Sequence, residues 1–419
     1  MRVLHVVQGY TPAIGGTELQ IQRVSEELVS QFGDDVTVFT SDCYNAGGFV
    51  DPRAPRLPTG WEEINGVHVR RFRVFNQAGP VLKPIQWLAF KLGLPFNQYL
   101  RVWYSGPHIL GLADAVRKAD VDVIGAASFP LLHMFTTLKA GRRAGLPVVL
   151  VGNQHPEDPW GFQRPMIHAA IHSSNAYIAL TDYEAKYVID HGTPARQVFN
   201  AGCGVDYAAF AGASQAKARL RLGLPQNVPV IGFIGQLGRN KGIDTLLRAM
   251  PKIWQAEPEA HLLVAGSRTS FQPQLEAIMK AWPPEFRRQT LLRLNFKEEE
   301  KSDLFAALDI FTYPSRYESF GIAFLEAWSA GKPVIGCRAG AVPWVVQQDV
   351  DGLLVRYQDP DALAAAAVSL VTDPARARKM AEAGMEKVKA KYTWPIVARR
   401  FREIYLEAAH SGRTSPTSG

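Results

Sequence analysis

Short apolar runs alternate with amphipathic stretches along the first half of the chain. Val148–Val151 is one such run and has the length of a buried strand. Leu132–Ala144 instead repeats its apolar residues at the spacing of one helix face. This alternation predicts βαβ units, in which helices cover both faces of a parallel sheet. The strands and helices expected in this first domain are 2–7, 18–32, 36–40, 121–126, 132–144, 148–151 and 176–180.

The same pattern restarts after a break between residues 204 and 229 that is rich in alanine, glycine and proline. The elements expected after the break are 230–234, 243–254, 261–265, 291–294, 302–307, 310–313, 321–330, 333–336, 360–370, 374–391 and 394–410. We therefore expect two doubly wound α/β domains, 1–206 and 229–392, joined by a linker at 207–228. The polar residues 411–419 are expected to be disordered. Open α/β sheets bind ligands beyond the carboxyl ends of their strands, so two such sheets facing each other would form a central cleft.

The length and the composition agree with this division. A chain of 419 residues is too long for one ordinary compact core and fits two domains. Its 47% hydrophobic and 20% charged residues exclude the disordered and fibrous classes of protein. Acidic and basic side chains balance at 18 each in residues 1–206, so the excess of seven positive charges lies in the second half. An anionic ligand is therefore more favoured there.

Three cysteines stand far apart, at positions 43, 203 and 337, and no CxxC pair is present. This spacing excludes a cysteine-rich zinc or redox site and favours a reducing compartment. The amino terminus shows no secretion signal, and no apolar run is long enough to cross a membrane. We therefore expect a soluble, cytoplasmic protein.

The most informative segment is Pro314–Glu326, which follows an expected strand and runs directly into an expected helix. We expect Ser319 or Phe320 to cap this helix, whose free N–H groups and dipole would form an anion site. Glu318 and Glu326 lie eight residues apart, or about 12 Å along a helix axis. A carboxylate cannot hold a phosphate, but it accepts hydrogen bonds from hydroxyls on either side of one. The segment therefore predicts a site for a sugar, a diphosphate and a ribose in a row, the alternative being two ordinary helical carboxylates.

Two glycine-containing loops also lie between an expected strand and an expected helix. Gly235–Gly242 carries Lys241 as a point charge and Arg239 as a forked donor, which is a phosphate-binding context. It matches neither a P-loop nor a dinucleotide-binding fingerprint. In the first domain, Gly15 and Gly16 would let a ligand approach the backbone closely. A plain turn without a ligand is the alternative for each loop.

Taken together, these segments resemble the GT-B glycosyltransferases, specifically retaining family 4. The resemblance covers nearly the whole chain, and its most specific part is the E-x7-E spacing followed by Ala-Gly-x-Pro-Val. The segments that carry it are Gly15-Gly16, Gly202–Asp206 with Phe210, Lys241-Gly242, Glu318 to Glu326, and Ala330–Val334. It implies an α/β, GT-B fold of two Rossmann-like domains, with the helix at 393–410 crossing back onto the first domain.

The resemblance also implies a role for each candidate residue in the second domain. Glu318, as a catalytic residue, would hold hydroxyls of the donor sugar, and Glu326 would hold the ribose. The backbone amides of Phe320, Gly321 and Ile322 would bind the diphosphate.

The remaining roles concern charge, the base and the first domain. Lys241, the second catalytic residue, would neutralise charge on the leaving β-phosphate, and Arg239 would assist. Backbone near Asn295 and Lys297 would meet the base, and Gly16 would approach the diphosphate from the first domain. Such enzymes generally need no metal, in agreement with the absence of a His/Cys cluster from the sequence. We therefore expect a nucleotide-sugar donor as partner, and neither a metal, a cofactor nor a nucleic acid.

This chain departs from the family pattern at two positions. Ala127 stands where the family commonly has a histidine near the donor sugar, and Gln236 stands where it commonly has an arginine. Ser128 or His155 could occupy part of the space of the missing imidazole. With Gly15, they are the residues expected on the acceptor side.

Aromatic and basic residues are interleaved in residues 81–108, a composition found in helices that bind a membrane surface. Burial of these aromatic residues in the core is the alternative. The overall prediction is a retaining glycosyltransferase acting on a lipid, saccharide or small-molecule hydroxyl, with peripheral contact at the inner membrane face as an option. A catalytically silent sugar-nucleotide-binding protein and another GT-B activity, such as a sugar-nucleotide epimerase, remain as alternative functions.

Overall fold

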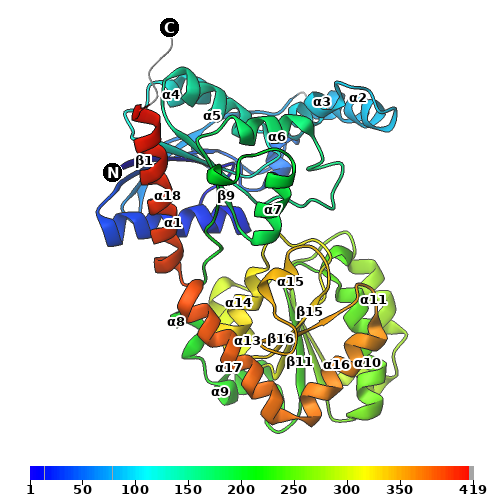
Figure 1. The fold of residues 1–419 in the computed structure, drawn as a ribbon. Helices are drawn as coiled ribbons and strands as arrows, with labels where there is room; N and C mark the ends of the chain where they lie inside the picture. The colour runs from blue at the N-terminus through cyan, green and yellow to red at the C-terminus, as the bar shows by residue number, and fades with distance from the viewer. Residues whose placement is uncertain (14, 78, 415–419) are drawn as a thin grey trace. The chain divides into compact units, whose positions relative to one another are not determined.

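The computed structural model describes residues 1–13, 15–77 and 79–414 and divides the chain into two compact units (Figure 1). Unit 1 is Met1–Cys203 together with the chain from Trp394 onward, and unit 2 is Gly204–Thr393. Each unit is an α/β layer structure around its own sheet, which is wholly parallel in unit 2 and mainly parallel in unit 1.

Unit 1 contains an eight-stranded sheet of order β10-β9-β8-β7-β1-β2-β4-β3 and a small β5-β6 pair. All neighbours in the large sheet are parallel except β3 and β4. The elements are β1 (Arg2–Val6), α1 (Gly16–Phe32), β2 (Asp35–Ser41), η1 (Ala46–Phe49), β3 (Gly60–Ile64), β4 (Val67–Phe72), β5 (Val74–Phe75), α2 (Gly79–Lys91), α3 (Asn97–Ser105), β6 (His108–Ile109), α4 (Leu112–Arg117), β7 (Val123–Ala127), α5 (Leu132–Arg143), β8 (Val148–Val151), α6 (Pro165–His172), β9 (Ala176–Ala179), α7 (Asp182–Asp190), η2 (Ala195–Gln197), β10 (Val198–Asn200) and α18 (Trp394–Thr414).

Helices cover both faces of this sheet because successive strand residues point to opposite faces. In β1, Val3 packs in the cluster that contains Ile21 of α1 and Phe401 of α18. Its neighbour Leu4 packs in the cluster that contains Met134 of α5. The predicted doubly wound arrangement is thus present in unit 1.

The last helix, α18, lies against α1 in unit 1. Its Arg402 forms an ion pair with the buried Asp34 at 2.7 Å. The helix continues to Thr414, so the prediction that residues 411–414 are disordered was wrong. The rest of that predicted tail, residues 415–419, lies outside the described residues.

The buried His5 connects three elements of unit 1. Its Nδ1 lies 2.7 Å from Ser25 Oγ on α1, and its Nε2 lies 3.0 Å from Tyr405 OH on α18. Burial lowers the pKa of His5 to about 3. Below the ordinary histidine pKa of about 6.5, the unfolded chain therefore binds a proton that the folded chain does not bind. Stability is lost as the pH falls from about 6.5 towards 3.

We expect wild-type protein to lose about 2 kcal/mol of unfolding free energy through His5 between pH 7.5 and pH 5.0. Urea titrations at the two pH values measure this loss. The variant His5→Gln should show a loss smaller by that amount, whereas the exposed-site control His410→Gln should match wild type. Equal losses in His5→Gln and wild type would show that His5 does not titrate as described.

Unit 2 contains six parallel strands in the order β13-β12-β11-β14-β15-β16. The order reverses direction between β11 and β14, which is where doubly wound sheets bind ligands. The elements are α8 (Tyr207–Ala211), α9 (Gln215–Leu222), β11 (Val230–Ile234), η3 (Arg239–Lys241), α10 (Ile243–Ala256), β12 (His261–Gly266), α11 (Gln272–Lys280), α12 (Pro284–Arg288), β13 (Thr290–Leu294), η4 (Glu298–Glu300), α13 (Lys301–Ala306), β14 (Ile310–Tyr313), α14 (Ile322–Ser329), β15 (Val334–Cys337), α15 (Val342–Val345), β16 (Gly352–Val355), α16 (Pro360–Thr372) and α17 (Pro374–Lys391).

Residues 207–228, for which we expected a linker, are instead an integral part of unit 2. They contain α8 and α9, which pack against α13 and α14. Arg219 of α9 is buried, pairs with Asp309 at 2.6 Å and donates to three backbone carbonyls of the following turn. These bonds fix the segment to the sheet, although its glycines and prolines suggested a flexible connection.

Candidate active site

Two loops of unit 2 meet at the carboxyl edge of the sheet, one after β11 and one after β14. The Arg316 N–H donates to the Asn240 carbonyl at 2.9 Å, and Ser315 Oγ donates to the same oxygen at 3.2 Å. Gly242 has a φ of 78°, and a Cβ at this position would lie 2.2 Å from the Pro314 carbonyl oxygen. Only glycine fits this close approach, which holds the two loops together.

Lys241 and Glu318, one from each loop, form an ion pair. The Lys241 Nζ donates to Glu318 Oε1 at 2.6 Å, and it lies 5.9 Å from the centre of the Tyr313 ring. Burial disfavours the ammonium charge, but the oxygens of Tyr313 and Glu318 more than offset this and raise the pKa of Lys241. Lys241 therefore keeps its proton at neutral pH and presents a fixed positive charge. The sequence predicted both residues for the site, but not their contact.

Helix α14 begins beside this pair. Its N-cap is Gly321, with a φ of 93° and no side-chain hydrogen bond, so the prediction that Ser319 or Phe320 caps the helix was wrong. Phe320 is instead buried, with its ring centre 5.3 Å from that of Tyr392. Among the described residues, no acceptor is found for the backbone N–H groups of Phe320, Gly321 and Ile322. A glycine cap thus leaves these donors available to an anion.

Glu326 lies one turn into α14 and is 6% exposed. Its Oε1 accepts from the Lys301 Nζ at 2.6 Å, and Lys301 also pairs with Glu298 at 3.1 Å. Burial disfavours the charged form of Lys301. The carboxylates of Glu326 and Glu298 more than offset this effect, so the pKa of Lys301 is raised. Glu326 is therefore a partnered buried carboxylate rather than an ordinary exposed helical residue.

Three further residues that were predicted to bind the nucleotide sugar follow the carboxyl ends of strands in unit 2. Arg239 has an exposed side chain whose Nε lies 3.8 Å from Asp244 Oδ2. Asn295 directly follows β13, and its N–H donates to the carbonyl of Gly266, the last residue of β12, at 2.9 Å. Lys297 is exposed at the start of the next turn.

The predicted acceptor-side glycines of unit 1 stand at the start of α1. Gly15 is its N-cap, and a Cβ there would lie 2.2 Å from Glu18 Oε2, so a side chain at this position would require the Glu18 carboxylate to move. Gly16 is exposed and begins the helix, while Ile14 lies outside the described residues. Burial raises the pKa of Glu18, which accepts a hydrogen bond from Gln8 at 2.8 Å. The backbone here is held close to a carboxylate.

Ser128 and His155 lie in different loops of unit 1, after β7 and β8. Ser128 has a φ of 94° and is nearly buried. His155 packs edge to face on Phe162, with ring centres 5.3 Å apart. A second imidazole, that of His133, lies with its Nε2 2.8 Å from the Ala127 carbonyl oxygen, and burial lowers the pKa of His133 to about 4. His133 is therefore neutral and bonded to the backbone of the position where the family histidine is missing.

Comparison with known families adds to this geometry. A family model described as Glycosyl transferase 4-like domain matches residues 15–204, and one described as Glycosyl transferases group 1 matches residues 228–373. Together the two matches cover most of the chain, one in each unit. The chain belongs to glycosyltransferase family 4.

Curated relatives of this glycosyltransferase agree with the assignment. The GDP-mannose-dependent monoacylated alpha-(1-6)-phosphatidylinositol monomannoside mannosyltransferase of Corynebacterium glutamicum is 28% identical over 70% of this chain and 78% of its own. A D-inositol 3-phosphate glycosyltransferase of Thermobifida fusca is 27% identical over 95% of this chain and 90% of its own. A protein of the same name from Segniliparus rotundus is 28% identical, with 68% of this chain and 63% of its own covered.

Solved glycosyltransferases share the fold. Sucrose-phosphate synthase from Thermosynechococcus elongatus has a TM-score of 0.73 at 20% identity, covering 98% of this chain and all of its own. Anabaena HepE in complex with UDP-glucose has a TM-score of 0.68 at 17% identity, covering 97% of this chain and all of its own. The predicted GT-B fold class is thereby confirmed. No helix in the described part of the chain combines the length and hydropathy needed to cross a bilayer.

Two residues that were not predicted from the sequence also contact the candidate site residues of this glycosyltransferase. Tyr313 ends β14 with its buried ring beside Lys241. Its position at the carboxyl end of a predicted strand was a usable signal. Lys301 bonds to Glu326 from the start of another helix, and no local pattern indicated that pairing.

Proposed function

We propose that the protein transfers a sugar from a nucleoside-diphosphate sugar to an acceptor hydroxyl, with retention of the anomeric configuration and without a metal ion. The observation that carries the proposal is the set of donors beside α14. Lys241 is a partly buried cation with a side chain 19% exposed, and the amides of Phe320, Gly321 and Ile322 have no protein acceptor among the described residues. Backbone donors and a lysine are sufficient in kind to bind a diphosphate.

The chemistry follows from where charge develops. Cleavage of the anomeric bond leaves an oxocarbenium-like sugar and a diphosphate with increased negative charge. Donors fixed at the diphosphate stabilise this transition state more than the ground state. The acceptor can attack from the face of the leaving group and pass its proton to a diphosphate oxygen, so the reaction needs no protein base. Glu318 and Glu326, each held by a lysine, would accept hydrogen bonds from sugar and ribose hydroxyls.

Turnover separates this proposal from its alternatives. Purified protein is incubated with UDP-, GDP- and ADP-sugars, with and without EDTA, and released nucleotide and transferred sugar are measured. We expect transfer to persist in EDTA and the product to keep the anomeric configuration, read by NMR. Binding without any release or transfer would support the silent-binder alternative, and an interconverted donor sugar would support an epimerase.

The acceptor is proposed to be presented at a membrane surface. Large apolar side chains project into solvent from the two helices α2 and α3 of unit 1, an unusual number for a soluble surface. Those at least half exposed are Val81, Trp87, Leu88, Tyr99 and Trp103. The exposed Lys83 and Lys91 also lie on α2, with the Lys91 Nζ 4.9 Å from the centre of the Trp87 ring. Aromatic and basic residues together match the interface of an anionic bilayer. The relative from Corynebacterium glutamicum is named for an acylated phosphatidylinositol acceptor.

We expect the protein to sediment with vesicles of phosphatidylcholine and phosphatidylglycerol, and the double variant Trp87→Glu/Trp103→Glu to remain in the supernatant. Trp61→Glu is the matched control, because Trp61 is 60% exposed on β3, outside α2 and α3. It should sediment like wild type. Wild type that stays in the supernatant, or a double variant that still sediments, would rule out docking through α2 and α3.

A further inference from the structure

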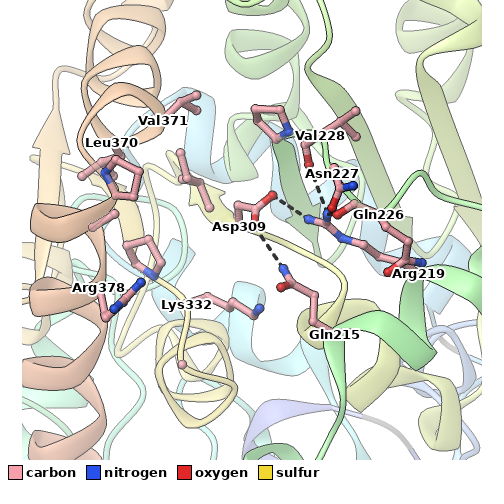
Figure 2. A pocket seen from close by; sticks show the side chains of 16 residues that line it. Gln215, Arg219, Gln226, Asn227, Val228, Asp309, Lys332, Leu370, Val371 and Arg378 are labelled. Carbon is pink, nitrogen blue, oxygen red and sulfur yellow. Dashed lines mark hydrogen bonds and ion pairs between the residues drawn. The ribbon is translucent and has the colours of Figure 1, made fainter.

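A pocket lies at the amino edge of the sheet in unit 2, opposite the edge that carries the loops of Lys241 and Glu318 (Figure 2). Its volume is about 530 Å³, which is within the range of small-molecule sites. It is lined by residues that directly precede the strands β11, β14 and β15, and by the ends of α16 and α17. At about 3.3 Å per residue, a five-residue strand such as β11 separates this pocket from the carboxyl-edge loops by about 16 Å.

Lys332 is the unusual residue of this pocket. Lys332 is only 8% exposed. Among the described residues, its amino group has neither a hydrogen-bond acceptor nor an ion-pair partner. Figure 2 shows the amino group pointing towards the side of the pocket formed by Gln215 and Asp309. A buried ammonium group without a partner is costly, so it indicates a place for an anion.

The nearest carboxylate is already in use. Asp309 accepts from Arg219 at 2.6 Å, from the Val230 N–H at 2.7 Å and from Gln215 at 3.0 Å. These bonds occupy Asp309, and Arg219 is likewise fully engaged with the backbone. The pair of Asp309 and Arg219 is electrically neutral, so the charge of Lys332 stays uncompensated.

A second cation and an apolar wall complete the pocket. Arg378 of α17 is exposed, lines the same space and has no ion pair among the described residues. Two available positive charges match a dianion better than a monoanion. Leu370, Val371 and Pro374 line the adjacent part of the pocket and suit an apolar group.

We propose that this pocket binds a small organic phosphate, with the phosphate group at the Lys332 amino group, Arg378 as a second positive charge on the pocket wall, and the organic group against Leu370 and Val371. The site is separate from the proposed donor site and does not depend on it. A ligand here would act as an effector rather than as a substrate, since the sheet lies between the pocket and the loops of Lys241 and Glu318.

The charge state of Lys332 gives the site a distinct pH dependence. Burial lowers the pKa of Lys332 to about 8, an effect that Asp309 opposes and Arg219 reinforces. The only other charged group lining the pocket among the described residues is Arg378. Below about pH 8 the free protein carries the proton that anion binding requires. Above that pH, affinity should fall by up to about tenfold per pH unit until the ordinary lysine pKa is approached.

Calorimetry with phenyl phosphate, benzoate and inorganic phosphate tests the proposal on the full chain. Phenyl phosphate should bind saturably and more tightly than either the singly charged benzoate or inorganic phosphate, which lacks the apolar group. The substitutions Lys332→Gln and Arg378→Gln should each weaken the binding of phenyl phosphate by about tenfold or more, as expected for a lost charge-assisted hydrogen bond. Lys379→Gln, an exposed neighbour that does not line the pocket, should bind like wild type.

The pH dependence is measured with sulfate, whose own charge is constant between pH 7 and pH 10. Its affinity should fall above pH 8 in wild type and stay flat in Lys332→Gln. The exposed Arg378 variant keeps the test decisive if Lys332→Gln fails to fold. The proposal is overturned if phenyl phosphate does not bind saturably, or if neither pocket variant weakens its binding. It is also overturned if Lys241→Ala abolishes phenyl phosphate binding, because that result would place the ligand at the donor site.

Discussion

Replacing Lys241 with alanine is expected to lower sugar transfer by about 100- to 1,000-fold, the effect of removing one fixed donor from a developing anion. Nucleoside-diphosphate affinity should fall as well, because the lysine charge is present in both ground and transition states. The structure gives the reason. The Lys241 side chain is only 19% exposed, and among the carboxylates of the described residues Glu318 alone lies within ion-pair distance of its Nζ.

The matched control is Lys252→Ala, on the neighbouring helix α10. Lys252 is half exposed and pairs with an exposed aspartate, a kind of surface ion pair worth at most about 1 kcal/mol. The sugar-transfer activity of Lys252→Ala should match that of wild type. Melting curves of both variants are needed, because Lys241→Ala leaves Glu318 buried without its partner. Wild-type donor affinity in a folded Lys241→Ala protein would remove the phosphate contact from the mechanism.

The second large effect is expected for Glu318→Gln. The amide keeps the shape and can still accept from Lys241, but it makes weaker hydrogen bonds to sugar hydroxyls than a carboxylate does. We expect the transfer rate to fall by about 10- to 100-fold, the loss of a charged hydrogen bond, while nucleoside-diphosphate affinity stays nearly unchanged. Steady-state kinetics and calorimetry together measure this separation.

Glu382→Gln serves as the control for the same chemical change, since Glu382 is exposed on α17. A double-mutant cycle with Lys241→Ala then measures how far the two residues act as a unit. Near-normal turnover in Glu318→Gln would mean that Glu318 only positions Lys241. A matching loss of nucleotide affinity would point to the same positioning role.

Much of the fold was predictable because many of its strands are short, mainly apolar segments with clear ends. Val148–Val151, Val230–Ile234 and Ile310–Tyr313 were predicted with the observed bounds. The strand Gly352–Val355 was not predicted, since four residues after a turn carry little periodicity, and it is defined by pairing with β15. The helices at 207–228 were hidden by the glycines and prolines between them.

Some residues of the candidate site could likewise be predicted from local sequence, whereas contacts between distant segments could not. The E-x7-E spacing and the lysine of the first loop are local features, and they made Glu318, Glu326 and Lys241 candidate site residues from the sequence. The N-cap at Gly321 was not predicted because serine is a commoner N-cap residue. A glycine in the left-handed conformation has no side chain to accept from the first N–H groups of the helix, so these groups stay free. The pairing of Lys301 with Glu326 joins separate helices, so no spacing in the sequence could show it.

The most direct test is a crystal structure of the protein soaked with a nucleoside diphosphate in the presence of EDTA. The account predicts diphosphate oxygens within hydrogen-bond distance of the Lys241 Nζ and of the amides of Phe320, Gly321 and Ile322. A diphosphate bound elsewhere, or one that binds only when a divalent metal is supplied, would contradict it.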